Sequence, residues 1–117
     1  MDTKEREIRI KVELDEQNIP EKIFWAAQDS EQAGFSETRA FNLSLWDHIN
    51  KETLRIGLWG KEMDVDEMKF FAIDTIGDLS QMIATATGDE KMAKEMVMLC
   101  RKLTEHVKEE QLKRNNK

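Results

Sequence analysis

The sequence has little cysteine, proline and glycine and no long apolar run, and these shortages exclude several classes of protein. A single cysteine, Cys100, cannot form an internal disulfide, which is typical of a protein in a reducing compartment. No apolar run approaches the roughly 20 residues that a membrane-spanning helix needs, so we expect no membrane insertion. With two histidines and one cysteine, the chain has no ligand set for a zinc site.

Positive charge is also in deficit. The chain carries 24 acidic and 18 basic side chains, a formal net charge of −6. Affinity for phosphate needs a concentrated basic surface, so nucleic acid is not an expected partner. Residues 1–6 are charged and lead directly into a strand pattern, so we also expect no secretory signal. These features predict a small cytoplasmic protein.

Alternating apolar and polar residues predict strands in the first half of the chain. Ile8, Ile10 and Val12 alternate with charged residues, and this period of two is typical of a strand with one buried face. The same reasoning, with turn residues between the runs, predicts strands over residues 7–14, 21–28, 38–47 and 53–59.

The last two predicted strands form a hairpin, and the alternation narrows its register to two choices. If paired residue numbers sum to 101, Leu45 lies opposite Ile56 and Asn50-Lys51 form a two-residue loop. A sum of 99 keeps the same side chains on the same faces. In both registers the aliphatic residues share one face, and the opposite face carries Trp46, Arg55 and Trp59.

Helix signals occupy the second half. Asp64 followed by Glu67 is a capping box and predicts a helix over residues 65–86. Gly88 can take the left-handed position that ends this helix, and Thr87 or Asp89 can cap a second helix over residues 89–111. Gly77 costs about 1 kcal/mol relative to alanine inside a helix, which indicates close backbone packing at that position.

These elements predict an α+β fold with the order ββββαα. The connections are too short for parallel crossovers, so the four-stranded sheet must be mainly antiparallel, with the two C-terminal helices packed on its aliphatic face as a second layer. We predict one α+β domain over residues 1–112 and a basic, disordered tail over residues 113–117. The predicted core between sheet and helices consists of Leu43, Leu45, Ile56, Leu58, Ile76, Leu79, Leu99 and Leu103.

No residue pattern predicts a chemical reaction. His48 beside Asp47 lacks a nearby nucleophile, and neighbouring turn residues seldom point together. The acidic run that begins at Asp64 lacks the glycine and the distal glutamate of a calcium loop, and a helix start explains its charge. Cys100 lies on a helical stripe and is predicted to be a small core residue. We therefore predict no catalytic, cofactor or metal-binding residue and no enzymatic activity.

The sharper feature is the face that carries Trp46, Arg55 and Trp59. Large exposed aromatic residues mark interfaces, and tryptophan and arginine often dominate binding energy. We predict that these three residues form a contact surface, used for self-association or for a protein partner. The alternative is that the connection over residues 28–38, or the N-terminal residues, folds over the indoles.

Several blocks of the sequence resemble the gliding-motility protein GldC family of Bacteroidota. The resemblance covers about residues 7–105, and its most specific blocks are Lys51-Glu52-Thr53-Leu54-Arg55-Ile56 and Thr87-Gly88-Asp89-Glu90-Lys91-Met92. It implies a small cytoplasmic accessory protein of the gliding machinery, whose components overlap with type IX secretion. It implies protein partners in that machinery, and the family has no established enzymatic activity or cofactor.

The order of four strands and two helices is also similar to that of SecB-type export chaperones, although no shared motif supports this similarity. Two functions therefore stay open. The first is a protein-interaction subunit that supports gliding or secretion, with a homo-oligomer as one possible state. The second is a chaperone or adaptor that holds unfolded or export-bound proteins.

Overall fold

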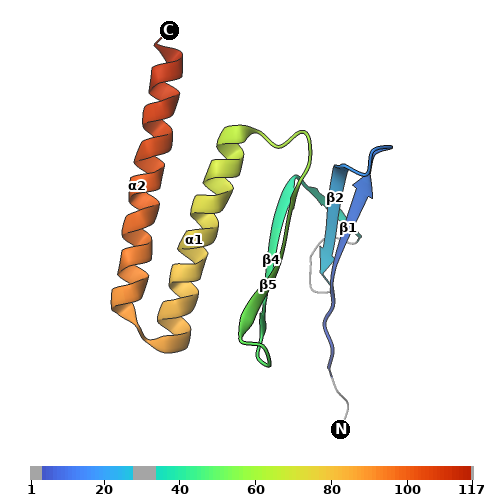
Figure 1. The fold of residues 1–117 in the computed structure, drawn as a ribbon, viewed down its shortest axis with the longest axis horizontal. Coiled ribbons are helices and arrows are strands. Elements are labelled where there is room, and N and C mark those ends of the chain that lie inside the picture. The colour runs from blue at the N-terminus through green and yellow to red at the C-terminus, as the bar shows by residue number, and fades with distance from the viewer. Residues whose placement is uncertain (1–3, 28–33, 117) are drawn as a thin grey trace. The chain divides into compact units, whose positions relative to one another are not determined.

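The computed structural model describes residues 4–27 and 34–116, and the chain divides into two compact units, Met1–Met63 and Asp64–Lys117. Figure 1 shows the strands in the first unit and the two helices in the second. The protein is therefore α+β, as the sequence predicts. The predicted packing of the helices on one face of a sheet involves both units, and it stays a prediction, as does the single domain.

The first unit contains two small antiparallel sheets among its described residues. The first sheet has the order β1-β2-β3, and the second pairs β4 with β5. Their bounds are Ile8–Leu14 for β1, Pro20–Ala27 for β2, Ser36–Thr38 for β3, Ala40–Asp47 for β4 and Glu52–Trp59 for β5. The prediction of a single four-stranded sheet is not confirmed. The predicted third strand corresponds to β4, which pairs with β5, whereas β2 pairs with β3, a short strand in the segment that was predicted as a connection.

The division occurs at Arg39, the one residue between β3 and β4. Before it, β3 pairs with β2, and after it, β4 pairs with β5. The Arg39 carbonyl accepts a hydrogen bond from the N–H of Gly60 at 2.9 Å. A Cβ at Gly60 would lie 3.2 Å from the Glu21 carbonyl oxygen, so glycine allows β2 and the end of β5 to converge. The period-two pattern cannot show this change of partner, because residues 36–39 are all polar and carry no alternation from which a strand or its partner can be predicted.

The β4–β5 register corresponds to the sum of 99, with Leu43 opposite Ile56 and Leu45 opposite Leu54. The two-residue loop of the other register is therefore wrong. Residues 48–51 form the loop, and the Asp47 carboxylate accepts hydrogen bonds from the N–H groups of Ile49 and Asn50 at 2.9 and 3.2 Å. In the four-residue loop, the N–H groups of Ile49 and Asn50 lie within reach of the Asp47 carboxylate. Their hydrogen bonds stabilise this loop and therefore favour the observed register.

The second unit is an antiparallel pair of helices, α1 (Val65–Thr87) and α2 (Glu90–Asn115). The Asp64 carboxylate caps α1 by accepting from the N–H groups of Asp66 and Glu67 at 3.0 and 3.1 Å. Gly88 ends α1 with φ of 73°, and Asp89 caps α2. These predicted start and stop signals are confirmed.

α2 continues beyond its predicted end at residue 111. Lys113 and Arg114 are helical, so the described part of the predicted tail belongs to the helix, while Lys117 lies outside the described residues. The cause is a long-range contact: the Arg114 guanidinium donates to the Asp66 carboxylate at 2.7 Å, and Gln111 donates to the same carboxylate at 3.2 Å. These contacts tie the last turns of α2 to the first turn of α1.

The most buried apolar residues of the described chain are Ile23 on β2, Ile73 on α1 and Val107 on α2. Several residues of the predicted core are exposed instead, including Leu45, Ile56, Leu79 and Leu99. Close packing at Gly77 is not found, since a Cβ at that position would meet no atom within 4 Å. Each of the three buried residues is assigned to one of the two units, Ile23 to the first and Ile73 and Val107 to the second. The predicted core contains residues from both units, and it stays a prediction.

Candidate functional site

The β4–β5 hairpin brings the three predicted contact residues onto one face. Trp46 lies opposite Thr53, Arg55 opposite Ser44, and Trp59 opposite Ala40, and cross-strand partners share a face of the sheet. Both indoles are exposed, Trp46 at 62% and Trp59 at 59% of the residue surface. No part of the chain that the structure describes therefore buries them. Of the two segments in the alternative interpretation, residues 1–3 and 28–33 lie outside that part.

The same register separates the two indoles along the hairpin. Trp46 lies beside the 48–51 loop, whereas Trp59 lies at the other end of β5. Thr53, which pairs with Trp46, is six residues from Trp59, a distance of about 20 Å at about 3.3 Å per residue. Arg55 is diagonal to Trp46, so the direct opposition that would favour guanidinium stacking on the indole does not occur. Within one chain the predicted surface is two separate indoles with an arginine between them.

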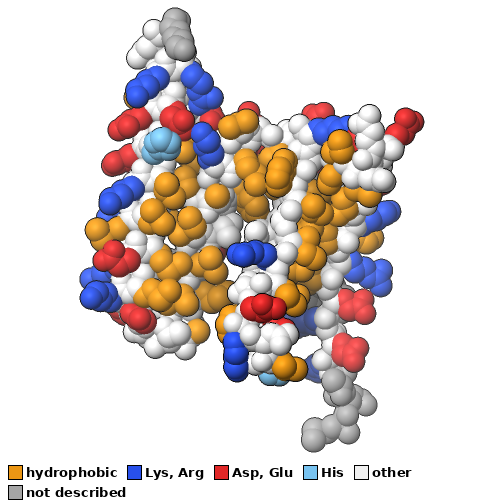
Figure 2. Space-filling model, in the orientation of Figure 1, with side chains coloured by type: hydrophobic (Ala, Val, Ile, Leu, Met, Phe, Trp, Pro, Cys, Tyr) orange, Lys and Arg blue, Asp and Glu red, His pale blue; other side chains and the backbone are white. Residues whose placement is uncertain are grey.

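The opposite face of the hairpin is aliphatic and is also open. Leu43 pairs with Ile56 and Leu45 pairs with Leu54, and these four residues are 37–55% exposed. A two-stranded hairpin is marginally stable when its apolar faces meet water. Figure 2 shows that apolar side chains gather on the surface of both units. The hairpin therefore carries apolar surface that favours contact with another molecule or another element.

The charged groups around the hairpins have structural tasks. The Asp15 carboxylate pairs with the Lys61 ammonium and accepts from the N–H groups of Gln17 and Ile19 at 2.8 and 3.0 Å. The Lys61 bond, followed by the backbone bonds, lowers the pKa of Asp15 to about 2. This carboxylate joins the β1–β2 turn to the segment that follows β5.

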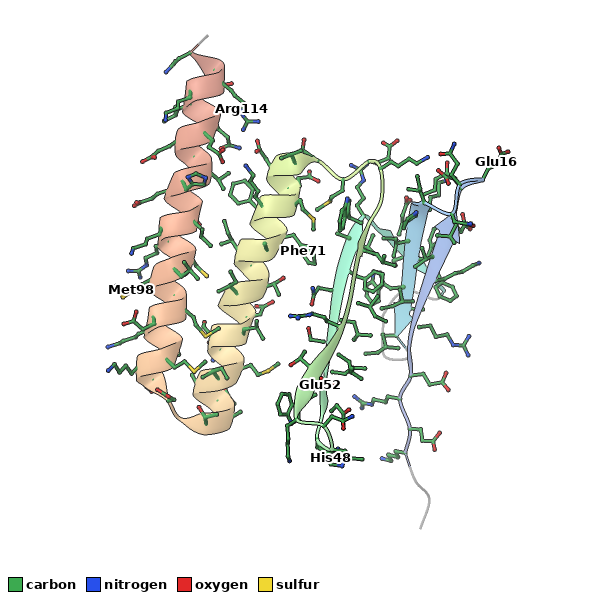
Figure 3. The ribbon with its side chains drawn as sticks, viewed as in Figure 1. Glu16, His48, Glu52, Phe71, Met98 and Arg114 are labelled. Carbon is green, nitrogen blue, oxygen red and sulfur yellow. The ribbon has the colours of Figure 1, made fainter. Side chains whose placement is uncertain are left out.

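The Asp47–His48 pair shows no arrangement for acid–base chemistry. Figure 3 shows His48 at the tip of the β4–β5 hairpin. The Asp47 carboxylate is committed to the loop, where the bonds from Asn50 and Ile49 lower its pKa. Its role is that of a turn residue.

The acidic residues at the start of α1 also have structural partners. Asp64 caps the helix, and the pKa of Asp66 is lowered mainly by its hydrogen bond from Arg114. Within residues 4–27 and 34–116, no group of three or more His, Cys, Asp or Glu side chains is placed to hold a metal ion. The Cys100 thiol donates to the Ile73 carbonyl at 3.5 Å, between the two helices.

Sequence reasoning missed a groove within the helix pair. It has a volume of about 480 Å³, and its lining includes Ser80, Ala84, Ala93, Val97 and Met98. Small residues at Ala84 and Ala93 leave the space between the helices, and their sequence positions alone do not show that they face one another. Figure 3 shows Met98 on the side of α2 that points away from α1, so it lies at the rim of this groove.

The comparison with protein families decides the identity of the chain. A family model described as gliding motility-associated protein GldC-like matches residues 20–109, which is most of the sequence. The chain belongs to the GldC-like family. The resemblance read from the sequence is therefore confirmed.

The GldC-like match begins at Pro20, the first residue of β2, and ends within α2, so it spans both units and includes Trp46, Arg55 and Trp59. No curated protein and no solved structure matches the chain. The similarity to SecB-type chaperones is not confirmed. Among the described residues of this GldC-like protein, neither helix combines the length and apolar composition needed to cross a membrane.

Proposed function

We propose that this GldC-like protein is a non-enzymatic, cytoplasmic accessory subunit of the gliding machinery and of the type IX secretion linked to it. It acts by binding a protein partner of that machinery through the face that carries Trp46, Arg55 and Trp59. The observation that supports this proposal is the exposure of both indoles on one face of a hairpin inside the family match. Tryptophan and arginine are among the residue types most enriched at the hot spots that dominate binding energy.

The second candidate is a chaperone or adaptor for unfolded or export-bound proteins. It is favoured by the exposed aliphatic face of the same hairpin, formed by Leu43, Leu45, Leu54 and Ile56. The two functions differ in selectivity. A dedicated subunit recovers the same gliding component in every capture, whereas a chaperone binds many unrelated unfolded chains.

Affinity capture from the native gliding bacterium tests the proposal. The wild-type protein should recover a component of the gliding machinery, identified by mass spectrometry. Replacing both tryptophans, Trp46→Ser with Trp59→Ser, should weaken this binding by about 2 kcal/mol or more, roughly 30-fold, with an unchanged circular dichroism spectrum. Leu112→Ser, at another exposed apolar residue on α2, is the matched control and should leave recovery unchanged.

Two results would contradict the proposal. The first is equal recovery of the gliding component by the wild-type protein and the double tryptophan variant. The second is broad suppression of aggregation of unrelated denatured proteins, in the absence of selective recovery, which would favour the chaperone.

A further inference from the structure

The outer edge of β5 carries backbone groups without a partner strand. β5 pairs with β4 along one side, and within the described ranges no strand pairs with its other side. In an antiparallel pair, every second residue of a strand turns its N–H and C=O toward the partner strand. Because the Gly60 N–H bonds to the Arg39 carbonyl, the residues of β5 that face β4 in this way are the even-numbered ones. The residues whose backbone groups point to the free edge are therefore Thr53, Arg55, Gly57 and Trp59.

This edge lacks the features that normally prevent strand pairing. Proteins protect edges with short strands, prolines, bulges or several charges. β5 has eight residues, no proline and a pairing with β4 that runs without a shift, and Arg55 is the one charged residue in its middle. The side chains beside the edge include exposed Leu54, Ile56 and Trp59. Such an edge is a template for another strand.

We propose that a second copy of this chain pairs with this edge, β5 against β5 in antiparallel order, with Ile56 opposite Ile56 on a two-fold axis. A two-fold symmetric pair is the commonest form of self-association. In this register Thr53 pairs with Trp59 and Arg55 pairs with Gly57 of the second copy. All the backbone groups that point to the free edge then exchange hydrogen bonds.

Other symmetric registers are less favourable. An axis through Arg55 places two guanidinium groups opposite one another, and like charges directly opposite are destabilising. An axis through Leu54 places Glu52 opposite an aliphatic Ile56 and leaves Trp59 opposite the 48–51 loop. The axis through Ile56 instead places Arg55 opposite Gly57 of the second copy, which has no side chain and leaves space for the guanidinium group. It also places Leu54 opposite Leu58 of the second copy on the aliphatic face.

The pairing changes the tryptophan surface. Trp46 pairs with Thr53 within one chain, and Thr53 pairs with Trp59 of the second copy. Trp46 and that Trp59 then lie on one face, two strands apart, at about 10 Å instead of about 20 Å. The dimer contains two such indole pairs. Each pair combines Trp46 of one copy with Trp59 of the other, whereas within one chain the two indoles are far apart. The pairing itself follows from the edge of β5 and does not rest on the proposed function.

Disulfide trapping tests this register. In a Cys100→Ser background, Ile56→Cys places two thiols opposite one another at a non-hydrogen-bonded pair, whose Cβ separation of about 4.5–5.5 Å is close to that of a disulfide. We expect most of the oxidised protein to migrate as a covalent dimer. Leu45→Cys, exposed on the same face but on β4, is the matched control and should stay monomeric.

A second pair of variants tests the backbone bonds. Gly57→Pro removes an N–H that points to the free edge, so β4–β5 pairing is kept and the dimer dissociation constant should rise by about tenfold or more. Gly57→Ala keeps the N–H and adds only a methyl group beside Arg55, so it should weaken the dimer far less than Gly57→Pro. Masses measured by light scattering after gel filtration give both results, and circular dichroism checks the fold.

The proposal is overturned if Ile56→Cys cross-links no better than Leu45→Cys, if Arg55→Cys cross-links in its place, or if the wild-type protein is monomeric at all concentrations. None of these results would alter the recovery of a gliding component that the tryptophan variants measure, so the two proposals fail separately.

Discussion

At the scale of single residues, short polar side chains decide where turns form and helices begin. Asp15, Asp47 and Asp64 each accept hydrogen bonds from the N–H groups of residues two to four positions ahead. A carboxylate suits this task because it offers two acceptor oxygens at the end of a short side chain. Asp15 differs from the other two in that it also pairs with Lys61, far away in the sequence.

This pairing predicts a pH dependence of stability. The pKa of Asp15 is about 2 in the folded protein and about 3.9 in an unfolded chain. The folded state therefore binds the proton less readily, and the stabilisation is complete above about pH 4 and is lost as the pH falls toward about 2. Urea unfolding between these pH values should show a smaller loss of stability for Asp15→Asn than for the wild-type protein. Equal losses would show that this carboxylate does not stabilise the fold.

At the scale of elements, the helices depend on their ends and on one glycine. Gly88 has a left-handed φ of 73° that ends α1, whereas Gly77 lies in the middle of α1 with open space around it. An alanine at Gly77 therefore removes the conformational cost of glycine without a steric penalty.

We expect Gly77→Ala to raise the free energy of unfolding by about 0.5–1 kcal/mol, measured by chemical denaturation. Gly88→Ala is the control in the same helix, and it should lower stability by roughly 1–2 kcal/mol because alanine is strained at a left-handed position. A destabilising effect of Gly77→Ala would show that another backbone packs closely on α1, as its sequence position first indicated.

At the scale of the whole molecule, each unit reports its unfolding through its own signal. The three tryptophans, Trp25, Trp46 and Trp59, belong to the first unit, and both helices belong to the second. Tryptophan fluorescence therefore follows the strands, and circular dichroism at the helical band follows α1 and α2. This separation allows a direct test of the single domain predicted from the sequence.

If the chain is one cooperative domain, Ile23→Ala should lower the melting temperature recorded by both signals together. Ile23 has no exposed surface, so the lost burial and the remaining cavity should cost about 2–5 kcal/mol. Ile73→Ala in α1 is the reciprocal variant and should also shift both transitions. A shift in the fluorescence signal alone after Ile23→Ala would show two domains that unfold independently.

Local patterns were sufficient for the family and for most of the elements, the short strand β3 and the end of α2 being the exceptions. The alternation from Ile8 to Leu14, the cap at Asp64 and the stop at Gly88 each act within a few residues, so their outcome can be read from the chain. The face that carries Trp46, Arg55 and Trp59 was predictable for the same reason, because both registers keep the same alternation.

The tertiary structure alone decided how those elements meet. Three features depend on contacts between distant residues. They are the β4–β5 register, in which paired residue numbers sum to 99 and not 101, the change of partner at Arg39 and the extension of α2 to Asn115. The contact of Arg114 with Asp66 is an example. The spacing of the two indoles follows from that register. Periodicity is a local property, whereas the choice of pairing partner depends on hydrogen bonds and packing that form only when remote segments come together.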